Sequence, residues 1–453
     1  MSNTREWIEQ HIRKAEEEIE EGRYDNAEAE LETVSARIKK EAERIKGLAP
    51  GENMEDIASN YRVLSELKAY LTKATSKLEI VKAEKDRSRR FRSVVKGIHE
   101  KRILDIIKKN QEAVAAFRDR DRTIKDTDRF IKILRRWNSY TPLLNLDPVE
   151  NLGGGYFLAW DGTGIVVDPG INFIKNAVSS GLSLKDINII VLTHSHVDHT
   201  SDFEGLVTLF HEINTLRYDL GLDPIQFSLY TSIGAMNKYC NLVSFAYDIF
   251  KEVNVVNPGS SYQLSDSIRM KTTPCQHQDL FCSHSSSCVG LKFYTDDEEK
   301  PSVSITSDTG YNPQLKEAFA DVEGRLVILH IGGIISEEME YTPLPNIPVY
   351  ESHLGLRGIL NFVFDVKPSI AIISEFGEEF KGVRMSLSDL FDEEFKDSKV
   401  IPADVGFTIE FVRDDSKMLV KCSKCQTMSP IAEIQPKLDG YAIVYICPNC
   451  RKE

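Results

Sequence analysis

Residues 193–200 read Thr-His-Ser-His-Val-Asp-His-Thr, which is four metal-binding side chains within six positions. The apolar, β-branched run directly before them predicts a short buried strand. Because alternate side chains of an extended chain point the same way, His194 and His196 can bind one metal ion. The neighbouring Asp198 and His199 diverge and can reach a second ion. Two such ions can hold a bridging hydroxide and polarise the bond that it attacks.

The elements on either side decide how this motif is presented. Residues 187–192 form the expected strand, and Ser201 with Glu204 has capping-box spacing, which predicts a helix that begins at Ser201. The positive end of that helix would favour an anionic group or a metal-bound hydroxide. The alternative is a polar loop with incidental histidines. The concentration here of three of the chain's ten histidines argues against it.

His-x-His-x-Asp-His after a strand resembles the signature of the metallo-β-lactamase fold hydrolases. The glycine-rich residues 153–170 resemble the opening hairpin of that family, with Asp168 as its first-motif aspartate. Residues 304–310 contain Asp308, which resembles the aspartate that bridges the two metals. The resemblance covers roughly residues 150–412. It implies an α+β fold, the metallo-β-lactamase αββα sandwich, in which two mixed β-sheets lie face to face with helices outside.

Two positions depart from the family pattern. The family has a histidine before the bridging aspartate, and both His277 and His284 fit, with His277 preferred and the other lining the site. Where the family has its last histidine, this chain has Glu375. A carboxylate binds zinc but also suits harder ions such as Mn²⁺. The expected metal ligands are therefore His194, His196, Asp198, His199, His277, Asp308 and Glu375; the alternative for Glu375 is that it lies outside the ligand set and the second metal is weak or absent.

Two further histidines follow apolar stretches. In related phosphodiesterases, a histidine near the position of His353 contacts the phosphate or protonates the leaving group, and imidazole suits that role. Asp198 and His353 are thus the residues expected to act in catalysis. The alternative for His353 is a structural role, which we prefer for His330. Asp168, His284 and His330 are expected to line the site.

The C-terminal residues carry a second metal motif. Cys422, Cys425, Cys447 and Cys450 form two Cys-x-x-Cys pairs with 21 residues between them. Two such pairs, brought together by a hairpin, make a thiolate site for structural zinc, so the tail resembles a zinc ribbon. A redox role is the alternative. A ribbon this small needs its metal to fold.

The 453 residues, 41% of them hydrophobic, allow three domains. We expect a helical, coiled-coil-like domain over residues 1–136, the hydrolase over 137–415 and the ribbon over 416–453. No apolar run is long enough to span a membrane, and the first residues lack an apolar signal segment. With no disulfide framework among the other cysteines, this predicts a cytoplasmic protein.

Apolar residues at helical spacing predict a hairpin over residues 3–46 and another long helix after residue 60. Because three apolar stripes exceed what a short hairpin can bury, we expect a homo-oligomer formed through these helices. Residues 82–136 hold nineteen basic against nine acidic side chains, although the whole chain has a net charge of −14. They are either an arm that follows nucleic-acid phosphates or a solvated helix face.

The sequence therefore predicts a metallo-hydrolase with two divalent ions in its active site, Zn²⁺ or Mn²⁺, and one structural zinc. The favoured reaction is phosphodiester hydrolysis by a metal-bound hydroxide, on a nucleic acid or a signalling nucleotide. One alternative is hydrolysis of a lactone, thioester or amide by the same centre. Another is a binding or assembly protein with a weakened metal centre.

Overall fold

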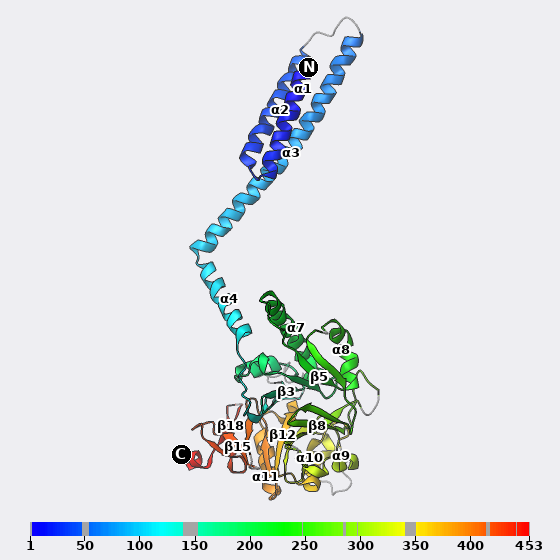
Figure 1. Cartoon of the computed structure of the whole chain (residues 1–453), viewed down its shortest axis with the longest axis vertical. Coiled ribbons are helices and arrows are strands. Elements are labelled where there is room, and N and C mark those ends of the chain that lie inside the picture. The colour runs from blue at the N-terminus through cyan, green and yellow to red at the C-terminus, as the bar shows by residue number, and fades with distance from the viewer. Residues whose placement is uncertain are drawn as a thin grey trace. The chain divides into compact units, whose positions relative to one another are not determined.

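The computed structural model describes residues 2–47, 54–138, 153–246, 248–283, 287–296, 298–339, 350–413, 417–440 and 442–452. The chain forms two compact units, Met1–Phe117 and Arg118–Glu453. Both are drawn in Figure 1. Among the described residues, no helix combines the length and the apolar character that crossing a membrane requires.

The first unit is built on a bundle of three helices, α1 (Ser2–Glu20), α2 (Tyr24–Lys46) and α3 (Met54–Glu100). Their apolar faces pack together around buried residues such as Ile8, Leu31 and Leu67. Gly22, with φ +74°, forms the turn between α1 and α2, where a side chain would be strained. The hairpin expected over residues 3–46 is thus present. The third stripe packs on it within one chain, which removes the reason given for self-association.

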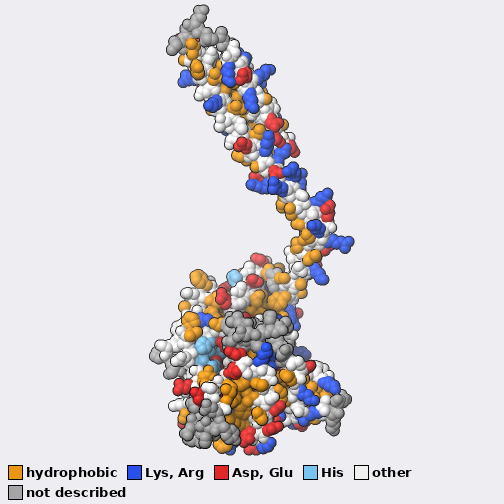
Figure 2. Space-filling model, turned by 180° about the vertical axis from the view of Figure 1, so that it is seen from behind, with side chains coloured by type: hydrophobic (Ala, Val, Ile, Leu, Met, Phe, Trp, Pro, Cys, Tyr) orange, Lys and Arg blue, Asp and Glu red, His pale blue; other side chains and the backbone are white. Residues whose placement is uncertain are grey.

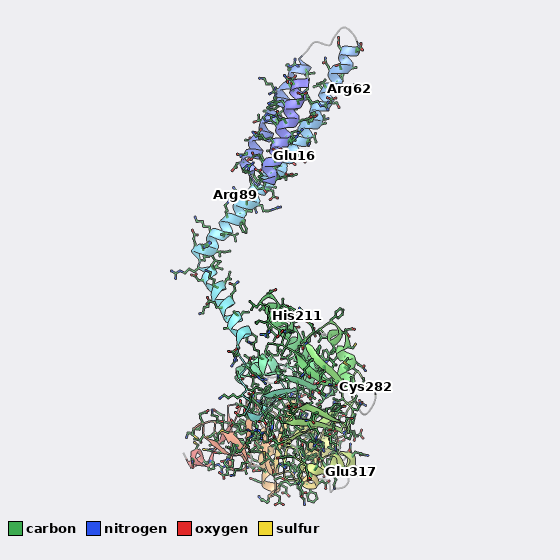
Figure 3. All side chains as sticks on the ribbon, in the orientation of Figure 1. Glu16, Arg62, Arg89, His211, Cys282 and Glu317 are labelled. Atoms are coloured by element: carbon green, nitrogen blue, oxygen red, sulfur yellow. The ribbon has the colours of Figure 1, made fainter. Side chains whose placement is uncertain are left out.

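The C-terminal part of α3 extends beyond the bundle and is followed by α4 (Ile103–Asp119). Arg89, labelled in Figure 3, lies on this part of α3. Basic side chains here pair with acidic ones about one turn away, as Arg90 Nε does with Asp86 Oδ2 at 2.8 Å. The basic segment is therefore partly neutralised by its own helix.

The second unit contains two large sheets. Within the described residues, the first sheet has nine strands in the order β16 (Met428–Pro430), β15 (Met418–Lys421), β14 (Thr408–Phe411), β1 (Arg129–Ile133), β2 (Tyr156–Trp160), β3 (Thr163–Val167), β4 (Ile189–Leu192), β5 (Phe227–Thr231) and β6 (Phe250–Val255). The second has seven, in the order β13 (Lys399–Pro402), β12 (Ile370–Phe376), β11 (Leu326–Gly332), β10 (Val303–Ile305), β9 (Val289–Thr295), β8 (Ile268–Pro274) and β7 (Ser261–Ser265).

The two sheets face each other across one apolar core. Ile131 and Ile165 of the first sheet belong to the same buried cluster as Leu291 and Ile328 of the second. Helices cover the outer faces: α6 (Phe173–Ser179), α7 (Val197–Asp219) and α8 (Ile233–Phe245) lie on the first sheet, and α9 (Pro313–Ala318), α10 (Gly355–Val366) and α11 (Arg384–Glu394) on the second. Strands buried on both faces explain the near-continuous apolar runs in the sequence. The expected αββα sandwich is confirmed.

The ends of this unit differ from the boundaries expected at residues 136 and 416. Strand β1 pairs with β2 and β14, so the chain has entered the sandwich before residue 136. At the other end, β15 pairs with β14, which makes the cysteine-rich tail an extension of the first sheet. An exposed strand edge accepts further strands readily. Residues 139–152, between β1 and β2, lie outside the described part of the chain.

Candidate metal centre

The candidate centre lies at the carboxyl ends of parallel strands. Strands β3 and β4 are parallel in the first sheet, and β10, β11 and β12 are parallel in the second. Asp168 directly follows β3, and His194 follows β4 by two positions. Asp308 follows β10, and Glu375 lies near the end of β12. Residues that leave parallel strands at one edge can converge on a ligand, which is why distant parts of the sequence meet here.

The histidine motif lies across the start of α7, which begins at Val197 rather than at the expected Ser201. Asp198 and His199 are therefore in its first turn. The start is fixed by a tertiary contact: the backbone N–H and the hydroxyl of Ser195 both donate to Asp279. Lys238 Nζ donates to the Ser195 carbonyl at 2.8 Å. These bonds override the local capping-box pattern, and Asp279 is a positioning residue that the sequence analysis missed.

A first group of donors brings together His194, His196, His277 and Asp308. His194 Nε2 lies 3.7 Å from Asp308 Oδ2, and His277 Nε2 lies 3.9 Å from the same oxygen. His277 Nε2 is 3.1 Å from His196 Nδ1. Three imidazole nitrogens and one carboxylate oxygen are a donor set that Zn²⁺ favours.

Hydrogen bonds fix which nitrogen of each imidazole faces this group. His194 Nδ1 lies 3.2 Å from the Thr193 hydroxyl, and His277 Nδ1 donates to the Ser352 carbonyl at 2.8 Å. The opposite nitrogens then carry free lone pairs, as metal ligation requires. His194 Nε2 is buried and has no hydrogen-bond partner among the described residues. Burial lowers the pKa of His194 and His277, so both are neutral donors.

A second group surrounds His199. Its Nε2 lies 3.3 Å from Glu375 Oε2, 3.4 Å from Asp308 Oδ2 and 3.6 Å from Asp198 Oδ2. Asp198, His199 and Asp308 form one group of donors that can hold a metal ion, and Glu375 belongs to an adjoining group with Asp308 and His330. His199 Nδ1 donates to Asp168 Oδ2 at 2.9 Å, which turns Nε2 toward the carboxylates. Although burial opposes it, Glu375 raises the pKa of His199, so a proton takes the cation's place when no metal is bound.

Two buried side chains, Arg135 and His330, contact one carboxylate oxygen of Glu375. Its Oε1 accepts a hydrogen bond from Arg135, whose side chain is fully buried, and lies 3.2 Å from His330 Nδ1. Its Oε2 is buried without a partner in the described part of the chain. Burial raises the pKa of Glu375, but Arg135 and His199 outweigh that effect and bring it to about 2. The carboxylate is therefore charged and presents one free oxygen to the second group.

His330, on β11 of the second sheet, links Asp308 to Tyr156 of the first sheet. Its Nδ1 lies 3.1 Å from Asp308 Oδ1, and its Nε2 is 2.9 Å from the hydroxyl of Tyr156. The same hydroxyl donates to the Ser374 side chain at 2.9 Å. His330 is fully buried and contacts Asp308 from within the core.

His353 lies at the open side of the centre. Its Nδ1 is 3.8 Å from Asp308 Oδ2 and, within the described residues, has no hydrogen-bond partner. Histidine side chains, pale blue in Figure 2, reach the surface of this unit. A Cβ on Gly332 would lie 2.3 Å from the ring of His353, so glycine is needed there to admit the imidazole. His353 is placed to act on a group bound beside Asp308.

Three residues at the centre have a strained backbone. Asp168, Ser307 and Glu375 are non-glycine residues with φ of 50°, 56° and 55°. Such conformations persist where surrounding contacts over-determine them, and they occur often at functional sites. Here Ser307 Oγ donates to Thr193 Oγ1 at 2.9 Å, which joins the two sheets beneath the histidine motif.

The cysteine-rich tail brings its four thiols together. Cys422, Cys425, Cys447 and Cys450 form one group that can hold a metal ion. Burial raises the pKa of Cys422, but backbone N–H groups of Cys425 and Cys447 lower it to about 6, which favours the thiolate that zinc requires. Strands β17 (Gln435–Asp439) and β18 (Ala442–Ile446) form a hairpin there. Four thiols in one group are a donor set that zinc accepts.

The structure thus brings the proposed ligands of the centre together, with Asp168, His330 and His353 around them. His284, the alternative to His277, lies outside the described residues. Arg135 and Tyr156 escaped the sequence analysis. Arg135 was counted in the basic segment of the helical domain, although it lies two positions after residues 129–133, a strand with alternating burial that belongs to the sandwich.

Residues 163–374 match the model of a beta-lactamase superfamily domain. A ribonuclease Z of Streptomyces coelicolor is 40% identical over 53 residues, 12% of this chain and only 18% of the relative's length. An uncharacterized protein of Methanocaldococcus jannaschii, MJ1374, is 24% identical over 270 residues, 58% of this chain and 89% of that protein. The metallo-beta-lactamase fold protein YhfI from Bacillus subtilis has a TM-score of 0.47 at 14% identity, covering 62% of this chain and 99% of that one. The family match, with the two-sheet sandwich and the histidine motif, identifies the second unit as a metallo-β-lactamase-fold domain with the architecture of a metal-dependent hydrolase.

Proposed function

We propose that this chain is a metal-dependent phosphodiesterase whose substrate is a nucleic acid. The observation that carries the proposal is the convergence of two donor groups on Asp308, with the free Nδ1 of His353 3.8 Å from Asp308 Oδ2. Two cations and a proton donor around one point are what cleavage of a phosphodiester needs. The number of metal-binding side chains gathered around Asp308 weighs against a binding protein with a weakened centre.

The donor chemistry fits two divalent ions. His194, His196, His277 and Asp308 would hold the first, and Asp198, His199 and Asp308 the second, with Glu375 Oε2 as a further donor 3.3 Å from His199 Nε2. Such ions would lower the pKa of a water molecule and neutralise charge that develops on the phosphoryl oxygens.

The chain's own residues supply orientation and the proton. Asp308 Oδ2 serves both donor groups, and His330 steadies it through Oδ1. Asp168 holds His199 in the tautomer that leaves Nε2 free. His353 would donate a proton from Nδ1 to the leaving oxygen, a step that contributes about 10²–10⁴-fold in rate.

Two observations favour a nucleic acid over a small ester. The local similarity to a ribonuclease Z is 40% over 53 residues. In addition, the first unit carries exposed arginines on α3. Arg87 and Arg90 pair there with acidic side chains of the same helix, and phosphates can replace such surface partners. Against this, Arg129, Arg135 and Arg136 of the basic segment are buried in the second unit and are not available to a polyanion.

A leaving-group comparison tests the proposal. The full chain with metals is assayed on bis(p-nitrophenyl) phosphate, on a short RNA and single-stranded DNA, and on a lactone and a thioester. Because nitrophenolate leaves without a proton, His353→Ala should hardly change that reaction but should slow cleavage of RNA or DNA about 10²–10⁴-fold. Turnover of the lactone or thioester, with none of any phosphodiester, would overturn the proposal.

A further inference from the structure

The two donor groups of the centre differ in chemistry. The first offers three imidazole nitrogens and one oxygen of Asp308. The second offers one imidazole nitrogen, from His199, and oxygens of Asp198, Asp308 and Glu375. Imidazole suits zinc, whereas carboxylate oxygens suit harder cations such as Mn²⁺. The same protein thus presents two neighbouring sites of unequal hardness.

Arg135 is what makes Glu375 usable as a ligand. Its Nε donates to the Gly154 carbonyl at 3.0 Å, its Nη2 donates to the Asp198 carbonyl, and its Nη1 donates to Glu375 Oε1. Because two of these three partners are backbone oxygens, the guanidinium is fixed in place. It therefore engages one carboxylate oxygen and leaves Oε2 directed at His199 Nε2, 3.3 Å away.

The ion pair with Arg135 also offsets the cost of burying the Glu375 carboxylate. A lone carboxylate buried among Asp198 and Asp308 would be costly, whereas a carboxylate paired with a guanidinium adds no net charge. Arg135 Nη1 lies 3.3 Å from His199 Nε2 as well, so the guanidinium borders the second group. Together Arg135 and Glu375 supply a hard oxygen donor without adding net charge to the centre.

We propose that Arg135 and Glu375 make the second donor group a site for a hard divalent cation of the Mn²⁺ class, while the first group holds Zn²⁺. Arg135 is a positioning residue, because it acts through Glu375. This inference deepens the proposed function, since it names the metals of the same centre.

The test measures metal binding rather than turnover. Full-length protein is stripped with a chelator, given two equivalents of Zn²⁺ for the ribbon and the first group, and titrated with Mn²⁺ while the electron paramagnetic resonance signal of free Mn²⁺ is followed. The native chain should bind one Mn²⁺. The double variant Arg135→Leu, Glu375→His exchanges the oxygen for imidazole without leaving a buried charge unpaired. It should bind Mn²⁺ at least about tenfold more weakly and Zn²⁺ no more weakly.

A second pair of variants keeps the test decisive if the double variant does not fold. Glu375→Gln should weaken Mn²⁺ binding more than Zn²⁺ binding. Asp404→Asn is its matched control, because Asp404 is also buried and paired with an arginine, Arg136 Nε at 2.7 Å, away from the centre. It should leave Mn²⁺ binding unchanged.

The outcomes separate this inference from the proposed function. Failure of the zinc-loaded native chain to bind Mn²⁺, or equal Mn²⁺ affinity in the native chain and the folded variants, would overturn the inference. A chain that binds one Mn²⁺ as expected but cleaves no phosphodiester would uphold the inference and overturn only the proposed function.

Discussion

The substitution Asp168→Asn tests how the second ion is held. Asp168 is fully buried, and its Oδ1 accepts the backbone N–H of Thr193 at 2.8 Å. Its Oδ2 accepts the Thr193 hydroxyl at 2.6 Å and His199 Nδ1 at 2.9 Å. A backbone N–H can only donate, so an asparagine here must keep its oxygen on Thr193 N and turn its NH₂ group toward His199.

The amide then donates to His199 Nδ1, and the imidazole proton moves to Nε2. That nitrogen is 3.4 Å from Asp308 Oδ2 in the second donor group, and once protonated it cannot bind a cation. Loss of such an orienting partner costs about 10–100-fold in metal affinity, or about 1.4–2.7 kcal/mol. The first ion should be retained, because the tautomer changes only at His199, and His199 is not one of the four ligands of that ion.

The assay is a competition titration against a chromophoric chelator, with elemental analysis of the retained ions. Asp186→Asn is the matched control: Asp186 is equally buried and accepts backbone N–H groups of Thr123, Ile124 and Ser183, but it lies outside the centre. If Asp168→Asn binds the second ion as tightly as the native protein does, the tautomer argument is wrong.

Three further predictions follow from the same contacts. Although burial opposes it, Glu375 raises the pKa of His199, so below that pKa a proton must leave Nε2 before the second ion binds. The affinity for the second ion should therefore rise about tenfold per pH unit up to that raised pKa. Burial lowers the pKa of His194, so the affinity for the first ion should stay flat over the same range, as calorimetry at several pH values can check. Gly332→Ala should displace His353 and slow cleavage of RNA with metal content unchanged, whereas Gly181→Ala, with φ +92° and nothing within 4 Å, adds strain without the clash and should leave cleavage intact. Cys447→Ser should lose the ribbon zinc and lower the Tm of the second unit, because the ribbon's Tyr445 donates to Pro402 O at 2.9 Å and packs in the sandwich core, while the exposed Cys240→Ser should change neither metal content nor Tm.

The sequence predicted those parts of the centre that depend on local spacing. His194, His196, Asp198 and His199 lie within six positions between β4 and the first turn of α7, so their relative positions follow from that strand and helix. Asp308 and Glu375 were predicted from their resemblance to motif positions of the metallo-β-lactamase fold hydrolases. Each of these predictions rested on one short stretch of sequence.

Other features depend on contacts between distant residues. The bond between Arg135 and Glu375 spans 240 positions, and no local pattern connects the two. The start of α7 is set by Asp279, 84 positions from Ser195, rather than by its own capping residues. The cysteine-rich tail joins the sandwich because β15 pairs with the edge strand β14. Composition alone does not reveal this pairing.

The central claim is that Asp308 lies between two metal ions, and counting metals tests it most directly. Elemental analysis of the full chain, purified without chelator, should find three ions per chain: two in the centre and one in the ribbon. His194→Ala should lose ions from the centre and keep the ribbon's, and Cys422→Ser should do the reverse. A native chain that carries one ion, retained after His194→Ala and lost after Cys422→Ser, would contradict the account.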